Sequence, residues 1–289
     1  MLGLALIGFW ALATPCSAEP RTRTSPVVRQ IDHVLIVSNQ AQELFTLLSH
    51  VFELPVAWPM SSYGSFASGG IAVGNVNLEI MQSSASKASS VAAVYVGLAL
   101  EPEPLGPTMR ELNARGIAHG PPQPFRSRRL FGPGKTLWTT LALPTVSSVT
   151  SEVFLCEYAH DTAARRLPLA EQLVARNGGP LSVQSVQEIV YEVKDLPWRE
   201  ELWQKLVAPV QPSSPRVWAL GNGPAIRLIS SDKDQVKGLV LKVRSLDQAR
   251  WFLEERGLVG TDQADTVILG GPLLEGLNLT LVEQRSADE

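Results

Sequence analysis

The side chains that could support catalysis or metal binding are few in this chain of 289 residues. Its histidines and cysteines are His33, His50, His119, His160, Cys16 and Cys156. Two cysteines exclude a disulfide scaffold and a four-cysteine zinc site. A metal site would therefore depend on carboxylates, which together with an imidazole suit a hard or borderline divalent cation.

One carboxylate stands out by its setting. Glu79 lies in NVNLEIMQ (75–82), where strand alternation places Asn77, Glu79 and Met81 on one face and apolar residues on the other. An acid among apolar strand residues must face water, a partner or a metal, because burying it unpaired costs several kcal/mol. Glu79 is therefore a candidate site residue.

Several function classes are excluded. The chain has 25 basic and 28 acidic residues and a net charge of −3, so it lacks the basic footprint of a nucleic-acid-binding protein. FGPGKT (131–136) lacks the spacing of a phosphate-binding P-loop, and no G-x-S-x-G nucleophile motif is present. Without a placed serine, no acyl-transfer triad is predicted.

The elements that would position these side chains follow a repeated order. Residues 30–38 predict a strand, residues 40–54 an amphipathic helix, and residues 56–82 three short strands separated by glycines. The strand, helix and strands recur at 94–158, 186–230 and 236–283. Such an internal repeat predicts four similar modules.

This arrangement resembles the vicinal-oxygen-chelate superfamily, which contains glyoxalases, bleomycin-resistance proteins and extradiol dioxygenases. The resemblance is carried by IDHV (31–34), the helix 42–54, YGSF (63–66) and NVNLE (75–79). It implies an α+β fold of four βαβββ modules, paired into two cupped mixed β-sheets with helices outside. The expected domains are 29–160 and 183–284, joined by a linker at 161–182.

The resemblance also implies a site in the first cup. His33 and Glu79 occupy the first- and fourth-strand ligand positions of the first module, and Gly97 and Glu157 those of the second. His33, Glu79 and Glu157 would then hold a divalent metal ion, with Glu157 able to act as a general base. Cys156 alternates with Glu157 and is expected to face the helices.

Three further residues are candidates for substrate binding. Tyr63 could stack on a ring of the substrate. Arg126 and Arg128 belong to a basic cluster that could bind a carboxylate or phosphate, or could form a solvated loop.

The second cup is expected to lack a metal site. Glu188, Arg227, Gly238 and Thr280 occupy its four ligand positions. Arginine has no lone pair to offer a cation, so Glu188 and Arg227 predict an ion pair. The second half is therefore interpreted as a degenerate structural copy.

The N-terminus predicts export. Residues 2–14 are continuously apolar and Cys16-Ser17-Ala18 resembles a cleavage site, which indicates a signal peptide at 1–18 followed by a flexible lead-in at 19–28. A misplaced start codon and an N-terminal membrane anchor are the alternatives. Cleavage would give a secreted or periplasmic protein without a membrane segment, because no later run reaches about 18 apolar residues.

Two functions remain open. One is metal-assisted chemistry on a small oxygenated substrate, by a lyase, isomerase or dioxygenase. The other is metal-free binding or sequestration of a small molecule, as in bleomycin-resistance proteins. In both, the partner is a small molecule rather than nucleic acid, and a homodimer is a candidate assembly.

Overall fold

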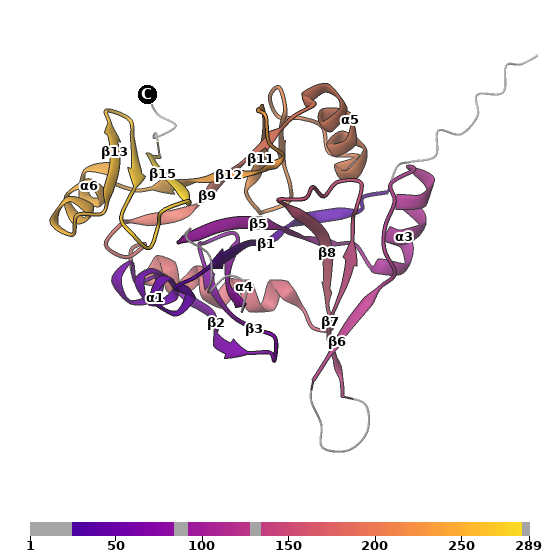
Figure 1. Ribbon diagram of the computed structural model, residues 1–289, viewed down its shortest axis with the longest axis horizontal. Helices are drawn as coiled ribbons and strands as arrows, with labels where there is room; N and C mark the ends of the chain where they lie inside the picture. Colours follow the sequence, from indigo (N-terminus) through magenta and orange to yellow (C-terminus); the bar gives the residue numbers. More distant parts are fainter. Residues whose placement is uncertain (1–24, 84–91, 128–133, 285–289) are drawn as a thin grey trace, which may run out of the picture.

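The computed structural model describes residues 25–83, 92–127 and 134–284. It contains two mixed β-sheets, of eight and seven strands, with helices around them (Figure 1). The predicted α+β fold of paired modules in two curled sheets is confirmed. The expected signal peptide lies outside the described residues.

The first module begins with a strand that is buried on both faces over most of its length, β1 (Val28–Ser38). The predicted helix divides into α1 (Ala41–Thr46) and the π-helical turn η1 (Leu47–Val51), whose apolar side chains face the core. Three strands follow: β2 (Val56–Ser62), β3 (Phe66–Ala72) and β4 (Asn77–Ser83). β4 returns to lie parallel to β1, as the repeat requires.

The second module repeats this path and completes the first sheet. Its elements are β5 (Ala93–Pro102), α3 (Leu105–Ala114), β6 (Gln123–Arg126), β7 (Thr136–Ala142) and β8 (Glu152–Tyr158). β5 pairs antiparallel with β1 and parallel with β8, which gives the strand order β2-β3-β4-β1-β5-β8-β7-β6. The two first strands therefore lie at the centre of the sheet.

The second sheet is built in the same way from the last two modules. Its elements are β9 (Val183–Val193), α5 (Leu196–Val207), β10 (Val217–Ala219), β11 (Ala225–Ser230), β12 (Gln235–Val243), α6 (Leu246–Glu255), β13 (Val259–Gln263), β14 (Thr266–Leu269) and β15 (Asn278–Glu283). The third module has two strands after its helix, not three. Asp195 and Ser245 accept backbone N–H bonds at the starts of α5 and α6, which explains where these helices begin.

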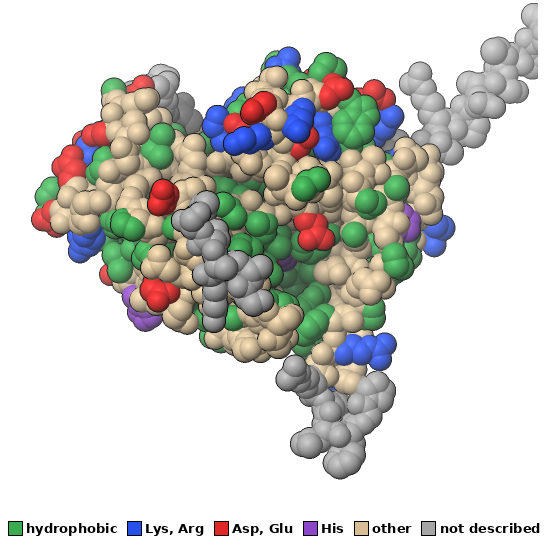
Figure 2. Space-filling view, viewed as in Figure 1, with side chains coloured by type: hydrophobic (Ala, Val, Ile, Leu, Met, Phe, Trp, Pro, Cys, Tyr) green, Lys and Arg blue, Asp and Glu red, His purple; other side chains and the backbone are tan. Residues whose placement is uncertain are grey.

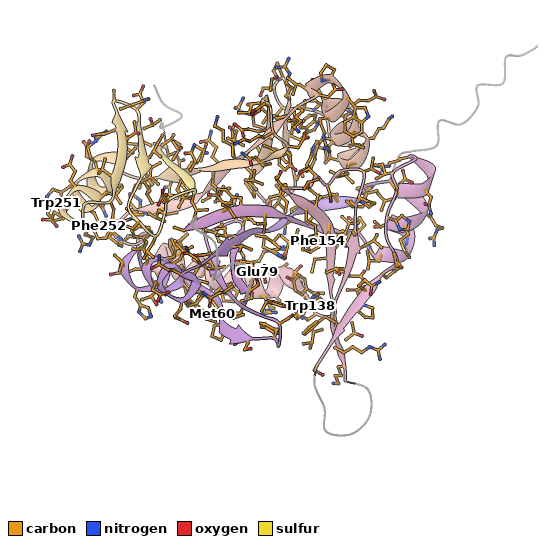
Figure 3. The ribbon with its side chains drawn as sticks, in the orientation of Figure 1. Met60, Glu79, Trp138, Phe154, Trp251 and Phe252 are labelled. Carbon is orange, nitrogen blue, oxygen red and sulfur yellow. The ribbon has the colours of Figure 1, made fainter. Side chains whose placement is uncertain are left out.

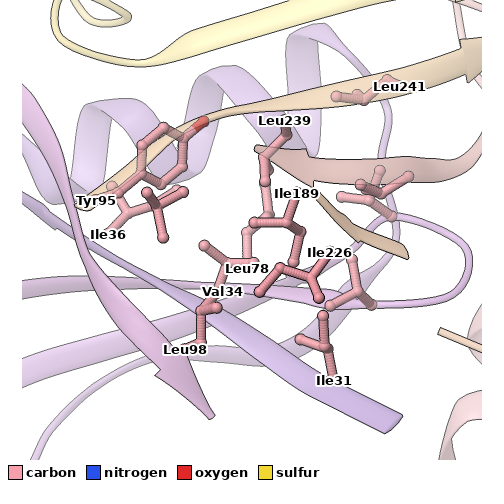
Figure 4. Packing of buried hydrophobic residues seen from close by; sticks show 14 of the residues in the cluster. Ile31, Val34, Ile36, Leu78, Tyr95, Leu98, Ile189, Ile226, Leu239 and Leu241 are labelled. Atoms are coloured by element: carbon pink, nitrogen blue, oxygen red, sulfur yellow. The ribbon is translucent and has the colours of Figure 1, made fainter. Parts of the chain in front are cut away.

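The two sheets share one hydrophobic core. In Figure 4, Val34, Ile36, Leu78 and Leu98 of the first sheet lie close to Ile189, Ile226, Leu239 and Leu241 of the second, and all are buried. Figure 1 shows β1 and β5 running beneath β9 and β12. Because the core uses one face of the central strands, alternation directs the remaining side chains of β1, such as His33 and Leu35, to the opposite face.

One helix lies outside the modules. α4 (Thr162–Ala175) occupies the segment that was expected to be a linker, and Asp161 caps its N-terminus. Leu173 is its only fully buried residue, so most of the helix is solvated. In Figure 1 it lies on the side of the first sheet that faces away from the second sheet. No helix in the described part of the chain is long and apolar enough to cross a membrane.

Candidate functional site

A cavity of about 650 Å³ opens on the face of the first sheet opposite the shared core. Its walls come from both modules and from α4, and they are mostly apolar or aromatic. Figure 2 shows a hollow lined by hydrophobic side chains on this side of the molecule. The volume lies within the range of small-molecule sites, which are typically about 300–1,000 Å³.

His33 and Glu79 meet in this cavity, as the sequence predicted. β1 and β4 are parallel, with His33 opposite Asn77 and Leu35 opposite Glu79, so both side chains emerge on the cavity face. Nε2 of His33 lies 3.0 Å from Oε2 of Glu79. Glu79 also accepts a 2.5 Å hydrogen bond from the Ser68 hydroxyl, which in turn accepts one from the Trp58 indole.

The other ring nitrogen of His33 connects it to a buried ion network. Nδ1 lies 2.7 Å from Oδ2 of Asp32, which also accepts a hydrogen bond from the Tyr158 hydroxyl. Arg166 of α4 donates to Asp32 and to Glu101. A chain of polar contacts therefore runs from Glu79 through His33 and Asp32 to the helix.

These contacts determine the ionisation of the buried groups. Burial alone would lower the pKa of His33, but the hydrogen bond to Asp32 and the nearby Glu79 carboxylate raise it to about 10. Burial would raise the pKa of Asp32 and of Glu79, but contact with the imidazolium lowers both. His33 is thus an imidazolium between two carboxylates at neutral pH.

Glu157 does not join His33 and Glu79, so the predicted set of three metal ligands does not form. Its carboxylate accepts a 2.9 Å hydrogen bond from the backbone N–H of Leu105, at the start of α3. Cys156, which was expected to face the helices, lines the cavity instead, and its burial raises the pKa of its thiol. The assignment of faces on β8 was wrong by one residue.

The residue on β8 that corresponds to Glu79 is Phe154. Glu79 pairs with Leu35, which lies two positions after His33 on β1. In the second module, Phe154 pairs with Ala99, which lies two positions after Gly97 on β5. Figure 3 shows the positions of Glu79 and Phe154 on the sheet. Gly97 has no side chain, and a Cβ there would lie 2.1 Å from the carbonyl oxygen of Glu152. The second module therefore supplies no donor at either position.

The donor set does not fit a catalytic metal ion. Such sites commonly use three protein ligands and leave one position open for water or substrate. Here His33 and Glu79 are two, and Phe154 and Gly97 replace the others. Within the residues that the structure describes, no group of three His, Cys, Asp or Glu side chains is placed to hold a metal.

Aromatic side chains from two hairpins form part of the cavity wall. Trp138 stacks on Phe125 with ring centroids 4.1 Å apart, and Tyr63 stacks on Phe66 at 5.4 Å. Tyr63 also contacts Phe125 edge to face, which joins the β2–β3 hairpin to the β6–β7 hairpin. Tyr63 therefore lines the cavity, as predicted.

The basic cluster is only partly described. Arg126 lies on β6 with its side chain exposed, and it does not line the cavity. Arg128 lies outside the described residues.

The second sheet contains the predicted ion pair. Two nitrogens of Arg227 donate to the two carboxylate oxygens of Glu188 at 2.7 and 2.6 Å. Gly238 and Thr280 occupy the other two positions. This pairing agrees with the interpretation of the second half as a degenerate copy.

Three residues of the site were missed by the sequence analysis: Asp32, Tyr158 and Arg166. Asp32 precedes His33 in the sequence and was not considered as a site residue. Tyr158 shares the cavity face of β8 with Cys156, which was assigned to the wrong side. Arg166 comes from the presumed linker, where the only signal was the pair Arg165-Arg166 near the N-terminus of a short helix.

Comparisons with known proteins support the fold. No family model and no curated protein sequence matches the chain. Among solved structures, a hypothetical protein from Staphylococcus aureus has a TM-score of 0.58 at 9% identity, over 88% of this chain and 99% of that one. Homoprotocatechuate 2,3-dioxygenase from Brevibacterium fuscum, in complex with 3,4-dihydroxyphenylacetate, has a TM-score of 0.56 at 9% identity, over 93% and 84%.

A second dioxygenase gives the same result. The homoprotocatechuate 2,3-dioxygenase from Arthrobacter globiformis has a TM-score of 0.54 at 10% identity, over 95% of this chain and 86% of that one. At such low identity the likeness concerns the fold. The chain thus has the vicinal-oxygen-chelate type of fold found in extradiol dioxygenases.

Proposed function

We propose that this protein binds a small, largely apolar molecule in the cavity of its first sheet without using a metal ion. The observation that carries the proposal is the register of β5 and β8, which puts Gly97 and Phe154 where donor side chains would be needed. The cavity has the volume and the largely apolar walls of a small-molecule binding site, although it lacks the donors of a metal site.

The position of His33 supports the same proposal. Both of its ring nitrogens face carboxylates, and as an imidazolium it has no lone pair for a metal. The cationic imidazolium balances part of the charge of Asp32 and Glu79, which in a metal site the ion itself would balance. Sequestration of the bleomycin-resistance type is the closest functional description.

Metal-assisted catalysis is the second candidate. It is favoured by the 3.0 Å approach of His33 to Glu79 and by the dioxygenases that share the fold. It would require metal binding by these two side chains together with ligands from the substrate.

The proposal also includes export of the protein, because the sequence of residues 1–18 has the features of a signal peptide.

Metal content and thermal melting test the proposal directly. We expect the protein purified without chelator to hold far less than one equivalent of metal. We also expect its melting temperature to be unaffected by EDTA or by added Mn²⁺, Fe²⁺, Ni²⁺ or Zn²⁺. One bound equivalent, or a chelator-sensitive melting temperature, would favour metal-assisted catalysis.

Ligand binding can be followed by tryptophan fluorescence, because Trp58 and Trp138 line the cavity. A panel of small aromatic compounds should include ones that quench this emission saturably. Trp138→Leu should reduce the quenching, whereas Trp251→Leu, at an exposed position on α6, should leave it unchanged. Equal loss in both variants would contradict binding in the cavity.

A further inference from the structure

The floor of the cavity and the network behind it carry an unbalanced charge. Asp32, Glu79 and Glu101 are three carboxylates linked by shared partners, since His33 contacts the first two and Arg166 contacts Asp32 and Glu101. Among the described residues, Arg166 and His33, the latter taken as protonated, are the two cations that contact them. The five groups sum to one net negative charge, and a neutral His33 would make it two. Uncompensated charge in a buried setting is costly, so a compensating ligand would be favourable.

Glu79 is the carboxylate with capacity to accept another donor. Asp32 receives hydrogen bonds from three side chains, and so does Glu101. Glu79 has Ser68 as its hydrogen-bond donor and the His33 contact at 3.0 Å. Its side chain is 17% exposed, against 3% for Asp32 and 10% for Glu101. The unbalanced charge is therefore accessible to a ligand at Glu79.

The walls near Glu79 are suited to a cation. Trp58 and Phe154 both contact the His33 ring edge to face, with centroids 6.3 and 6.0 Å away, and both line the cavity. Aromatic faces attract cations through their quadrupole, most strongly when water is excluded. Arg165 also lines the cavity, but it is exposed, and its guanidinium donates to Nε2 of His160. Solvent there screens its charge.

On the basis of the binding function proposed above, we propose that the ligand is a small organic cation. Its protonated amine contacts the Glu79 carboxylate, and its apolar body lies against the aromatic walls. Binding brings the net charge of the five-group network and ligand to zero. A neutral or anionic molecule of the same shape lacks this contribution.

Three probes of equal size test the charge preference: 2-phenylethylamine, 2-phenylethanol and phenylacetate. Titration calorimetry at pH 7 with the metal-free protein should show the amine binding at least about tenfold more tightly than the alcohol, since a charge-assisted hydrogen bond exceeds a neutral one by about that factor. Phenylacetate should bind most weakly. Tighter binding of the alcohol or of phenylacetate overturns the proposal but leaves the binding function intact.

Variants identify the carboxylate responsible. Glu79→Gln should abolish the preference for the amine, and Glu79→Asp should keep most of it. Glu152→Gln removes an exposed carboxylate at the cavity rim and should preserve the preference. Circular dichroism and thermal melting of each variant verify folding. An equal loss in Glu79→Gln and Glu152→Gln would mean a diffuse charge effect and would refute the assignment to Glu79.

The same measurements separate this proposal from the binding function. If none of the probes binds at millimolar concentration, the cation proposal is overturned. The function is then judged independently by fluorescence quenching with the aromatic panel, which does not depend on ligand charge.

Discussion

Nε2 of His33 lies 3.0 Å from Oε2 of Glu79, which joins the first strand of the first module to its fourth strand at the floor of the cavity. The contact is not isolated, because Asp32 holds the other nitrogen of the same imidazole. Two carboxylates therefore share one cation that belongs to the chain itself.

Replacing Phe154 by His should create a metal site. The new imidazole would occupy the position on β8 that corresponds to Glu79, and a metal ion bound there would displace the proton from Nε2 of His33, which would bring the number of donors to three. We expect Zn²⁺ or Ni²⁺ to raise the melting temperature of Phe154→His. At a metal concentration a hundredfold above the Kd, the free energy of unfolding should increase by about 2.7 kcal/mol. Wild type should show no such gain. If both proteins respond equally to metal, the register argument fails.

Replacing Glu79 by Gln should lower the pKa of His33. The carboxylate is one of the two groups that raise this pKa, and the amide retains the shape without the charge. NMR titration of the imidazole in wild type and variant measures the shift directly. An identical pKa in both proteins would show that Glu79 and His33 do not interact in solution.

Stability should decrease as the pH rises above neutrality. His33 has a pKa of about 10 in the folded protein and 6.5 as its ordinary value, so its stabilising contribution is complete below about pH 6.5 and is lost as pH rises to 10. Urea unfolding at pH 6, 8 and 9.5 should show a loss of a few kcal/mol. His50→Gln, at an exposed position, should follow the wild-type curve. A flat wild-type profile would contradict a protonated His33.

At low pH the sign is reversed. The pKa values of Asp32, Glu79 and Glu101 are lowered in the folded protein, so their contribution is present above their ordinary pKa and is lost on acidification. The same urea series extended to pH 3 should show this second decline.

Arg166 should be a major contributor to stability. Its guanidinium contacts both Asp32 and Glu101, and its removal would leave two carboxylates without their cation. We expect Arg166→Gln to cost about 3–5 kcal/mol in urea unfolding. Arg165→Gln, at the adjacent exposed position, should change stability by less than about 0.5 kcal/mol. Similar costs for the two variants would mean that the network does not stabilise the fold.

The fold could be predicted from the sequence because its signals are local and repeated. Each module begins with a branched apolar strand followed by an amphipathic helix, and these patterns need no knowledge of distant residues. The pairing of His33 with Glu79 was implied by the resemblance to the vicinal-oxygen-chelate superfamily, and the parallel register of β1 and β4 places both on one face of adjacent strands. The four positions in the second half were correct for the same reason.

The faces of β8 could not be assigned in this way. The strand EVFLCEY is apolar on both faces, so alternation gives two sets of residues without saying which set faces the cavity. Glu157 was assigned to the cavity because it is the acid near the end of the strand. Its actual partner is the backbone N–H of Leu105, in a helix about fifty residues earlier. Only the tertiary structure brings that donor to the carboxylate.

The position of Arg166 on α4 has a consequence for how the chain can be divided. The helix connects the two halves, yet it supplies both a wall of the cavity and the cation for Asp32 and Glu101. A fragment that ends at residue 160 would contain every strand of the first sheet but would leave these two carboxylates without their guanidinium. The binding site therefore needs α4 as well as the strands, and the end of the last strand of the first sheet is not a boundary of function.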